Sequence, residues 1–169
     1  RQMCIGDMPS SVRTGSWPPI HNGRTRGRER RVVDYSDLDT HRLKLDVYEP
    51  LDKVRAGEKR PAIVQIHGGA WVVGSKDEQG VPLLNHLAAN GWVGFNVEYR
   101  LSPRAKFPSH LVDCKAALAW IRTHAEDYGV DPDFIAVTGG SAGGHLTALM
   151  ALTENDPAFQ PGFAAALAL

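Results

Sequence analysis

The strongest chemical signal in the sequence is a serine set among glycines, in the segment Gly139-Gly140-Ser141-Ala142-Gly143. The segment follows an apolar run typical of a strand and precedes an apolar pattern with helical spacing. A serine exposed on a sharp strand-to-helix turn requires neighbours without side chains two positions to either side, and Gly139 and Gly143 meet that requirement. The pattern therefore predicts that Ser141 is a nucleophile for acyl transfer.

A second glycine-rich segment, His67-Gly68-Gly69-Ala70-Trp71, follows an earlier apolar run. Acyl transfer passes through an oxyanion, which converging backbone N–H groups stabilise. We expect these donors from this segment and from the residue after the nucleophile, namely Gly68, Gly69, Ala70 and Ala142. The imidazole of His67 is expected to hold this loop by a hydrogen bond rather than to take a proton.

No histidine in the sequence is a good candidate for the general base. His145 lies one helical turn after Ser141, but the helix is expected to carry it away into packing. Three others fall on predicted helices, where we expect them at the surface: His86, His110 and His124.

The elements that must position these groups alternate along the chain. Two strands with alternating polarity are predicted first, over 32–35 and 43–48. Buried strands then alternate with helices, over 62–66, 81–90, 93–97, 109–128, 134–138 and 142–152. This order predicts an α/β fold with a mostly parallel sheet and helices on both faces. A further strand starts at Phe163, so we expect the fold to be truncated in the strand after the nucleophile helix.

The sequence divides into two parts at about residue 30. Residues 1–30 are rich in Arg, Gly and Pro without a sustained period, and we expect a flexible arm there. Residues 31–169 carry all the motifs and are expected to form the N-terminal part of the α/β domain.

Composition excludes several classes of function. Nineteen Lys and Arg balance nineteen Asp and Glu, so no net charge favours nucleic acid. The two cysteines, Cys4 and Cys114, have no metal-ligand spacing, and we expect neither a metal nor an organic cofactor. No apolar run approaches the roughly 18 residues of a membrane span. The sequence does not determine the compartment, and the cytoplasm is only the default expectation.

Three blocks of sequence, in order, carry a family resemblance. They are His67 to Trp71 with Gly74, Tyr99-Arg100-Leu101-Ser102-Pro103 followed by Phe107-Pro108 and Asp113, and Gly139 to Gly144. Together they resemble the hormone-sensitive-lipase-like carboxylesterases of the α/β-hydrolase fold. Three positions depart from the family pattern, with Ala70 in place of Gly, Arg104 in place of Glu and Gly140 in place of Asp. In the middle block we expect Arg100 and Asp113 to form a buried pair that positions the loop.

The resemblance implies a serine hydrolase that cleaves small-molecule carboxylic esters through an acyl-enzyme on Ser141. The family's catalytic histidine and acid follow later strands, and we expect both beyond Leu169. Residues 1–169 alone are therefore expected to be inactive. Two alternatives remain open: an arylformamidase or other amide hydrolase of the same fold, and a non-enzymatic ligand receptor of that fold.

Overall fold

The computed structural model describes residues 28–38, 41–52 and 57–162. The predicted arm, apart from its last three residues, and the predicted strand from Phe163 onward lie outside the described residues.

A five-stranded mixed sheet forms the centre of the molecule, in the order β1-β2-β4-β3-β5. The strands are β1 Arg28–Leu38, β2 His41–Pro50, β3 Arg60–Ile66, β4 Val93–Val97 and β5 Val130–Gly139. Antiparallel pairing joins β1 to β2 and β2 to β4, whereas β3 is parallel to both β4 and β5. The alternating strands therefore form the antiparallel side and the apolar strands the parallel side, as their patterns predict.

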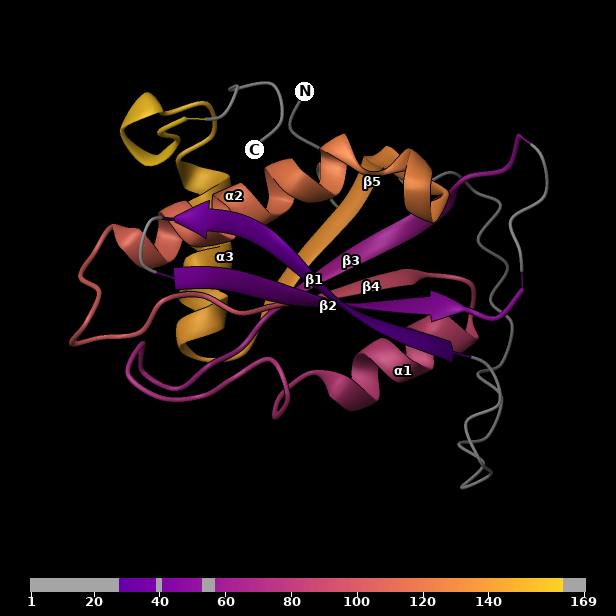
Figure 1. The fold of residues 1–169 in the computed structure, drawn as a ribbon, viewed down its shortest axis with the longest axis horizontal. Helices are drawn as coiled ribbons and strands as arrows, with labels where there is room; N and C mark the ends of the chain where they lie inside the picture. The colour runs from indigo at the N-terminus through magenta and orange to yellow at the C-terminus, as the bar shows by residue number, and fades with distance from the viewer. Residues whose placement is uncertain (1–27, 39–40, 53–56, 163–169) are drawn as a thin grey trace.

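Helices cover both faces of the sheet (Figure 1). On one face, α2 (Ser109–Thr123) and α3 (Ala142–Leu152) bury a large apolar cluster that includes Leu118, Phe95 and Val64. On the other face, α1 (Val81–Ala89) packs Leu84 and Ala88 against β3 and β2 through a smaller cluster. The layered α/β architecture predicted from the sequence is confirmed.

The helix predicted to reach Tyr128 is shorter than expected. It ends at Thr123, and the chain continues into the 3-10 turn η1 (Glu126–Tyr128). Gly129 closes this turn at φ 61°, a left-handed conformation that glycine adopts without strain. A second 3-10 turn, η2 (Pro157–Phe159), follows α3.

Strand β5 departs from the prediction of a buried strand. Phe134 is 51% exposed and Val137 is only half-buried. Within the described residues β5 pairs with β3 alone, so one edge and much of its surface are uncovered. Residues 131–133 interrupt the pairing within β5, since the partner of Arg60 is Val130 whereas the partner of Ala62 is Ile135. The carboxylate of Asp131 accepts the N–H of Asp133 there.

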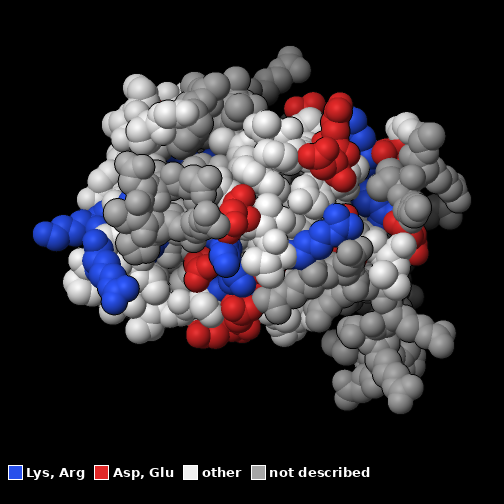
Figure 2. All heavy atoms as spheres, viewed as in Figure 1, with Lys and Arg blue, Asp and Glu red and all other residues white. Residues whose placement is uncertain are grey.

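Charged side chains of both signs are interspersed on the face shown in Figure 2, as the balanced composition suggests. In the part of the chain that the structure describes, no helix has the length and apolar character needed to cross a bilayer.

Candidate active site

Ser141 occupies a strained turn between β5 and α3. Its backbone has φ 53° and ψ −118°, a conformation that costs a residue with a β-carbon about 1–3 kcal/mol. The residue is exposed at the first turn of α3. Close packing imposes this geometry, because added β-carbons on Gly139 and Gly143 would lie 2.7 Å and 2.1 Å from the carbonyl oxygen of Ile66. The steric requirement predicted from the glycine spacing is thus present in the structure.

The loop after β3 reverses direction beside Ser141. Three successive residues have positive φ: Gly69 at 118°, Ala70 at 52° and Trp71 at 62°. The carbonyl of Gly69 accepts hydrogen bonds from the N–H groups of Val72 and Val73, both at 3.0 Å. The loop lies against the serine, since a β-carbon added to Gly68 would be 3.4 Å from the Ser141 β-carbon.

Three of the four expected oxyanion donors are free in this geometry. The N–H of Gly68 donates to Oε1 of Gln79 at 2.9 Å, so this group already has an acceptor. The other three N–H groups find no acceptor among the described residues: Gly69, Ala70 and Ala142. The last of these lies at the start of α3, where backbone N–H groups lack intrahelical partners.

His67 is buried under this loop. Its Nδ1 lies 2.7 Å from the carbonyl oxygen of Gly68, and its ring stacks on Tyr99 with centroids 4.3 Å apart. Burial lowers the pKa of His67, which favours the neutral imidazole. A neutral ring that is fully buried is suited to supporting the loop.

A second segment, from Tyr99 to Ser102, supports the loop from behind. The hydroxyl of Tyr99 donates to the carbonyl of His67 at 3.0 Å, and burial raises the pKa of Tyr99 to about 12, so the donor is retained. The N–H of Ser102 donates to the carbonyl of Trp71 at 2.8 Å.

The predicted pair of Arg100 and Asp113 fixes this supporting segment. Nη2 of Arg100 lies 2.7 Å from Oδ1 of Asp113, and the Asp113 carboxylate also accepts the Arg100 backbone N–H at 3.0 Å. Asp113 is fully buried, and its hydrogen bonds raise the pKa of Arg100. The pairing predicted from the sequence is confirmed.

Two histidines lie where the sequence did not place them. His145 is exposed rather than packed. Its ring makes a T-shaped contact with the ring of Trp71, with centroids 5.2 Å apart. His110 is only 4% exposed, because α2 turns it inward against Tyr99, so the surface position expected for it is wrong. No hydrogen bond joins the side chain of Ser141 to any of the histidines whose side chains the structure describes: His67, His86, His110, His124 and His145.

A cavity of about 290 Å³ opens beside the loop and is mainly apolar. It is lined by Ala70, Trp71, Ser102, Phe107, His110, His145 and Leu146. A larger cavity of about 400 Å³ lies at the amino ends of the parallel strands, near Arg60 and Val93. Ligands of open α/β sheets bind at the carboxyl ends of the strands, which favours the smaller cavity beside the loop. Across the described residues no cluster of His, Cys, Asp or Glu is suited to a metal ion.

Residues that the sequence analysis missed connect the loop to the sheet. Oε1 of Gln79 accepts the N–H of Gly68, and the backbone carbonyl of Gln79 accepts Nδ2 of buried Asn96. Earlier in the same loop, Lys76 forms a buried ion pair with Asp46. The available signal was Asn96, a polar residue inside the apolar strand β4; Asp46 falls on the polar positions of an alternating strand and gave no such signal.

Comparison with known families places this site in context. Residues 45–166, which include both glycine-rich segments, match the BD-FAE family. The chain belongs to the BD-FAE family. The BD-FAE match includes both glycine-rich segments, and the structure brings them together because the loop after β3 lies against the serine turn.

Two named relatives of this BD-FAE chain are ester hydrolases. It is 54% identical over 119 residues to the probable carboxylic ester hydrolase LipM of Mycobacterium tuberculosis, covering 70% of this chain and 27% of that protein. It is 42% identical over 156 residues to the esterase LipC of the same organism, covering 91% of this chain and 37% of the relative. The chain therefore spans about a third of the length of these relatives. The predicted membership of the hormone-sensitive-lipase-like carboxylesterases is confirmed.

A solved structure extends the likeness to the fold. Thermogutta terrifontis esterase 2, in a form phosphorylated by paraoxon, superposes with a TM-score of 0.71 at 35% identity, over 85% of this chain and 54% of the esterase. The α/β-hydrolase fold predicted from the sequence is confirmed.

Proposed function

We propose that this chain carries the nucleophile and the oxyanion hole of a serine carboxylesterase. The observation that carries the proposal is the exposed Ser141 at positive φ, with the free N–H groups of Gly69 and Ala70 on the adjacent loop. Relatives named as esterases support the reaction class, and the paraoxon adduct of the structural neighbour supports a reactive nucleophile in this fold.

In the proposed reaction, Oγ of Ser141 attacks the ester carbonyl carbon and loses its proton to a general base. The tetrahedral oxyanion accepts hydrogen bonds from the N–H groups of Gly69, Ala70 and Ala142. The C–O bond to the alcohol then breaks, and the base returns the proton to the leaving alkoxide. Water attacks the acyl-enzyme in the same way and releases the acid together with free Ser141.

The general base lies outside the described residues in this proposal. A serine hydroxyl is a weak nucleophile without such a base, and no histidine whose side chain the structure describes bonds to Ser141. Residues 1–169 expressed alone should therefore lack ester turnover. The apolar cavity beside Ala70 is proposed to hold an uncharged organic part of the substrate.

The test uses the full-length protein and its Ser141→Ala variant. We expect paraoxon to phosphorylate Ser141, as located by peptide mass spectrometry, and turnover of p-nitrophenyl esters to disappear in the variant. An adduct on another residue, or unchanged turnover in Ser141→Ala, would refute the proposal. Parallel assays measure turnover of aryl formamides, and faster turnover of these amides than of esters would indicate an amide hydrolase. Binding of esters without turnover would indicate a ligand receptor.

A further inference from the structure

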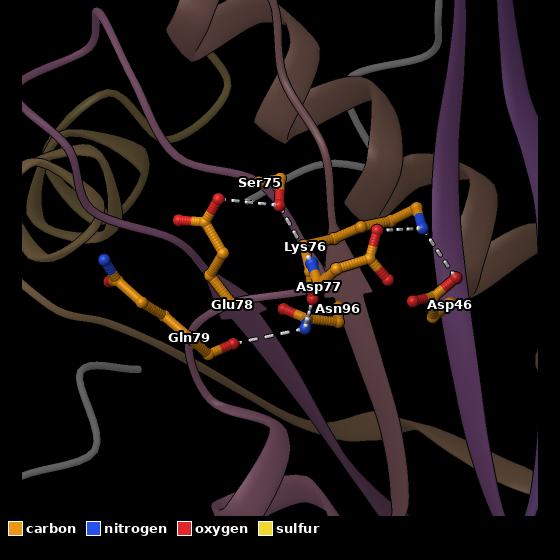
Figure 3. A network of polar contacts seen from close by, with 7 residues as sticks. All are labelled: Asp46, Ser75, Lys76, Asp77, Glu78, Gln79 and Asn96. Carbon is orange, nitrogen blue, oxygen red and sulfur yellow. Dashed lines mark hydrogen bonds and ion pairs between the residues drawn. The ribbon is translucent and has the colours of Figure 1, made fainter.

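A buried polar network connects the sheet to the loop that follows the oxyanion segment (Figure 3). Lys76 extends from this loop to Asp46 on β2, with Nζ 3.1 Å from Oδ1. Asp46 is fully buried, and the Lys76 side chain is 9% exposed. A charge pair so far removed from water offsets its desolvation cost only when the two groups are well aligned and further hydrogen bonds satisfy them. The network therefore fixes the backbone at Lys76 relative to the sheet.

Asn96 on β4 extends this attachment along the loop. Its Nδ2 donates to the carbonyl of Lys76 and, at 3.3 Å, to the carbonyl of Gln79. Asn96 is itself fully buried, so its side chain has little freedom. The backbone of Gln79 is thus held from the sheet, as Figure 3 shows.

The side chain of Gln79 lies between the two halves of the candidate active site. Its Oε1 accepts the N–H of Gly68 at 2.9 Å. A β-carbon added to Gly140 would lie 3.9 Å from the same oxygen, which places Oε1 close to the serine turn as well. No other residue of the described ranges bonds the N–H of Gly68.

We propose that Gln79 is a positioning residue for the oxyanion hole, and that Asp46, Lys76 and Asn96 hold it in place. Gln79 fixes the peptide of Gly68, and thereby aims the next N–H groups, Gly69 and Ala70, at the oxyanion. This inference rests on the function proposed above.

The physical basis is the sensitivity of an oxyanion hole to small displacements. Donors must lie about 2.7–3.1 Å from the oxyanion, and a shift of about 1 Å in a reacting geometry can cost about 100-fold in rate. The loop is strained at Ala70 and Trp71, which have positive φ with a β-carbon, so contacts from outside the loop are needed to keep this conformation. Tyr99 and Ser102 hold the carbonyls of His67 and Trp71, and Gln79 adds the contact to the N–H of Gly68.

The test compares full-length Gln79→Met with Glu78→Met and Ser141→Ala. Methionine matches glutamine in length but offers no amide oxygen to Gly68. Glu78 is the adjacent residue and is exposed, as Gln79 is; its described hydrogen bond is a weak one to Ser75 at 3.4 Å, so its replacement is a matched control. For each variant, kcat and KM for a p-nitrophenyl ester and the melting temperature are measured.

We expect Gln79→Met to lower kcat by about 10- to 100-fold, with KM changed less than about threefold. Its melting temperature should match that of Glu78→Met, which should retain parental kcat. Parental kcat in Gln79→Met, with Ser141→Ala inactive, would overturn the positioning role alone. A raised KM at unchanged kcat would show that Gln79 binds substrate, and a large fall in melting temperature would show a structural role; both overturn the inference. Full turnover in Ser141→Ala would overturn the proposed function with it.

Discussion

The carbonyl oxygen of Ile66 lies 2.1 Å from the position that a β-carbon on Gly143 would occupy. Ile66 is the last residue of β3, and Gly143 is the second residue of α3. The nucleophile helix therefore packs directly on the backbone from which the oxyanion loop begins. This contact sets the distance between Ser141 and the loop.

Replacement of Gly143 by alanine should destabilise the protein. A helix interior normally gains about 1 kcal/mol from Gly→Ala, but the clash with Ile66 should outweigh this gain. Overpacking costs about 1–3 kcal/mol or more, and we expect Gly143→Ala to lie at or beyond the upper end. Urea unfolding of the full-length protein measures the difference.

Gly140→Ala is the matched control for that experiment. Its added β-carbon meets nothing closer than Oε1 of Gln79 at 3.9 Å. We expect its free energy of unfolding to stay within about 0.5 kcal/mol of the parent. Equal losses in Gly140→Ala and Gly143→Ala would show that the contact with Ile66 does not determine stability.

Replacement of Gly69 by valine should impair turnover more than substrate binding. Gly69 has φ 118°, and an added β-carbon would lie 1.9 Å from the carbonyl oxygen of Val73, so the loop must move. Loss of one oxyanion donor costs about 2.7–4 kcal/mol of transition-state stabilisation, or about 100- to 1,000-fold in kcat. Steady-state kinetics of the Gly69→Val variant and the parent give kcat and KM. A raised KM at normal kcat would show that the loop binds substrate instead.

Replacement of Lys76 by methionine should lower stability. The change leaves the carboxylate of Asp46 buried without its cationic partner, which typically costs about 3–5 kcal/mol. Chemical denaturation should show this loss, and the double variant Asp46→Leu with Lys76→Met should recover much of it. A single variant as stable as the parent would argue that the pair is dispensable.

Stability should fall as the pH drops below about 6.5. Burial lowers the pKa values of His67 and His110 below the ordinary value. Below about pH 6.5 these imidazoles are therefore protonated in the unfolded chain while they stay neutral in the folded protein. The stabilisation is complete above about pH 6.5 and is lost as the pH falls towards the folded-state pKa values. Urea unfolding at pH 7.5, 6.5 and 5.5 tests this, in a range above the ordinary carboxylate pKa values.

The variant His110→Gln should have a shallower dependence on pH in the same range, because one of the two buried imidazoles is gone. Constant stability from pH 7.5 to 5.5 in the parent would contradict the assignment of buried neutral histidines.

The sequence predicted most elements because their periodicities are local properties. Alternation over Leu43 to Tyr48 indicated an antiparallel strand, and continuous apolar runs indicated the parallel ones. The helix 142–152 was predicted with its observed bounds, because the glycine-rich turn marks its start. The exposure of Phe134 was not predictable, since it depends on which strands and helices lie beside β5.

Ser141 and the glycine loop were candidates from sequence alone, because strand, sharp turn and helix follow one another along the chain. The engagement of Gly68 by Gln79 was decided by tertiary structure, since it joins residues from opposite ends of a loop whose path has no periodicity. Likewise, the residues that hold this loop, Asp46 and Asn96, come from two strands far apart in the chain, and only the pairing of β2 with β4 brings them together. Steric limits on φ and apolar periodicity depend on residues that are neighbours in the sequence. A hydrogen bond across the fold, in contrast, forms only after the sheet has assembled.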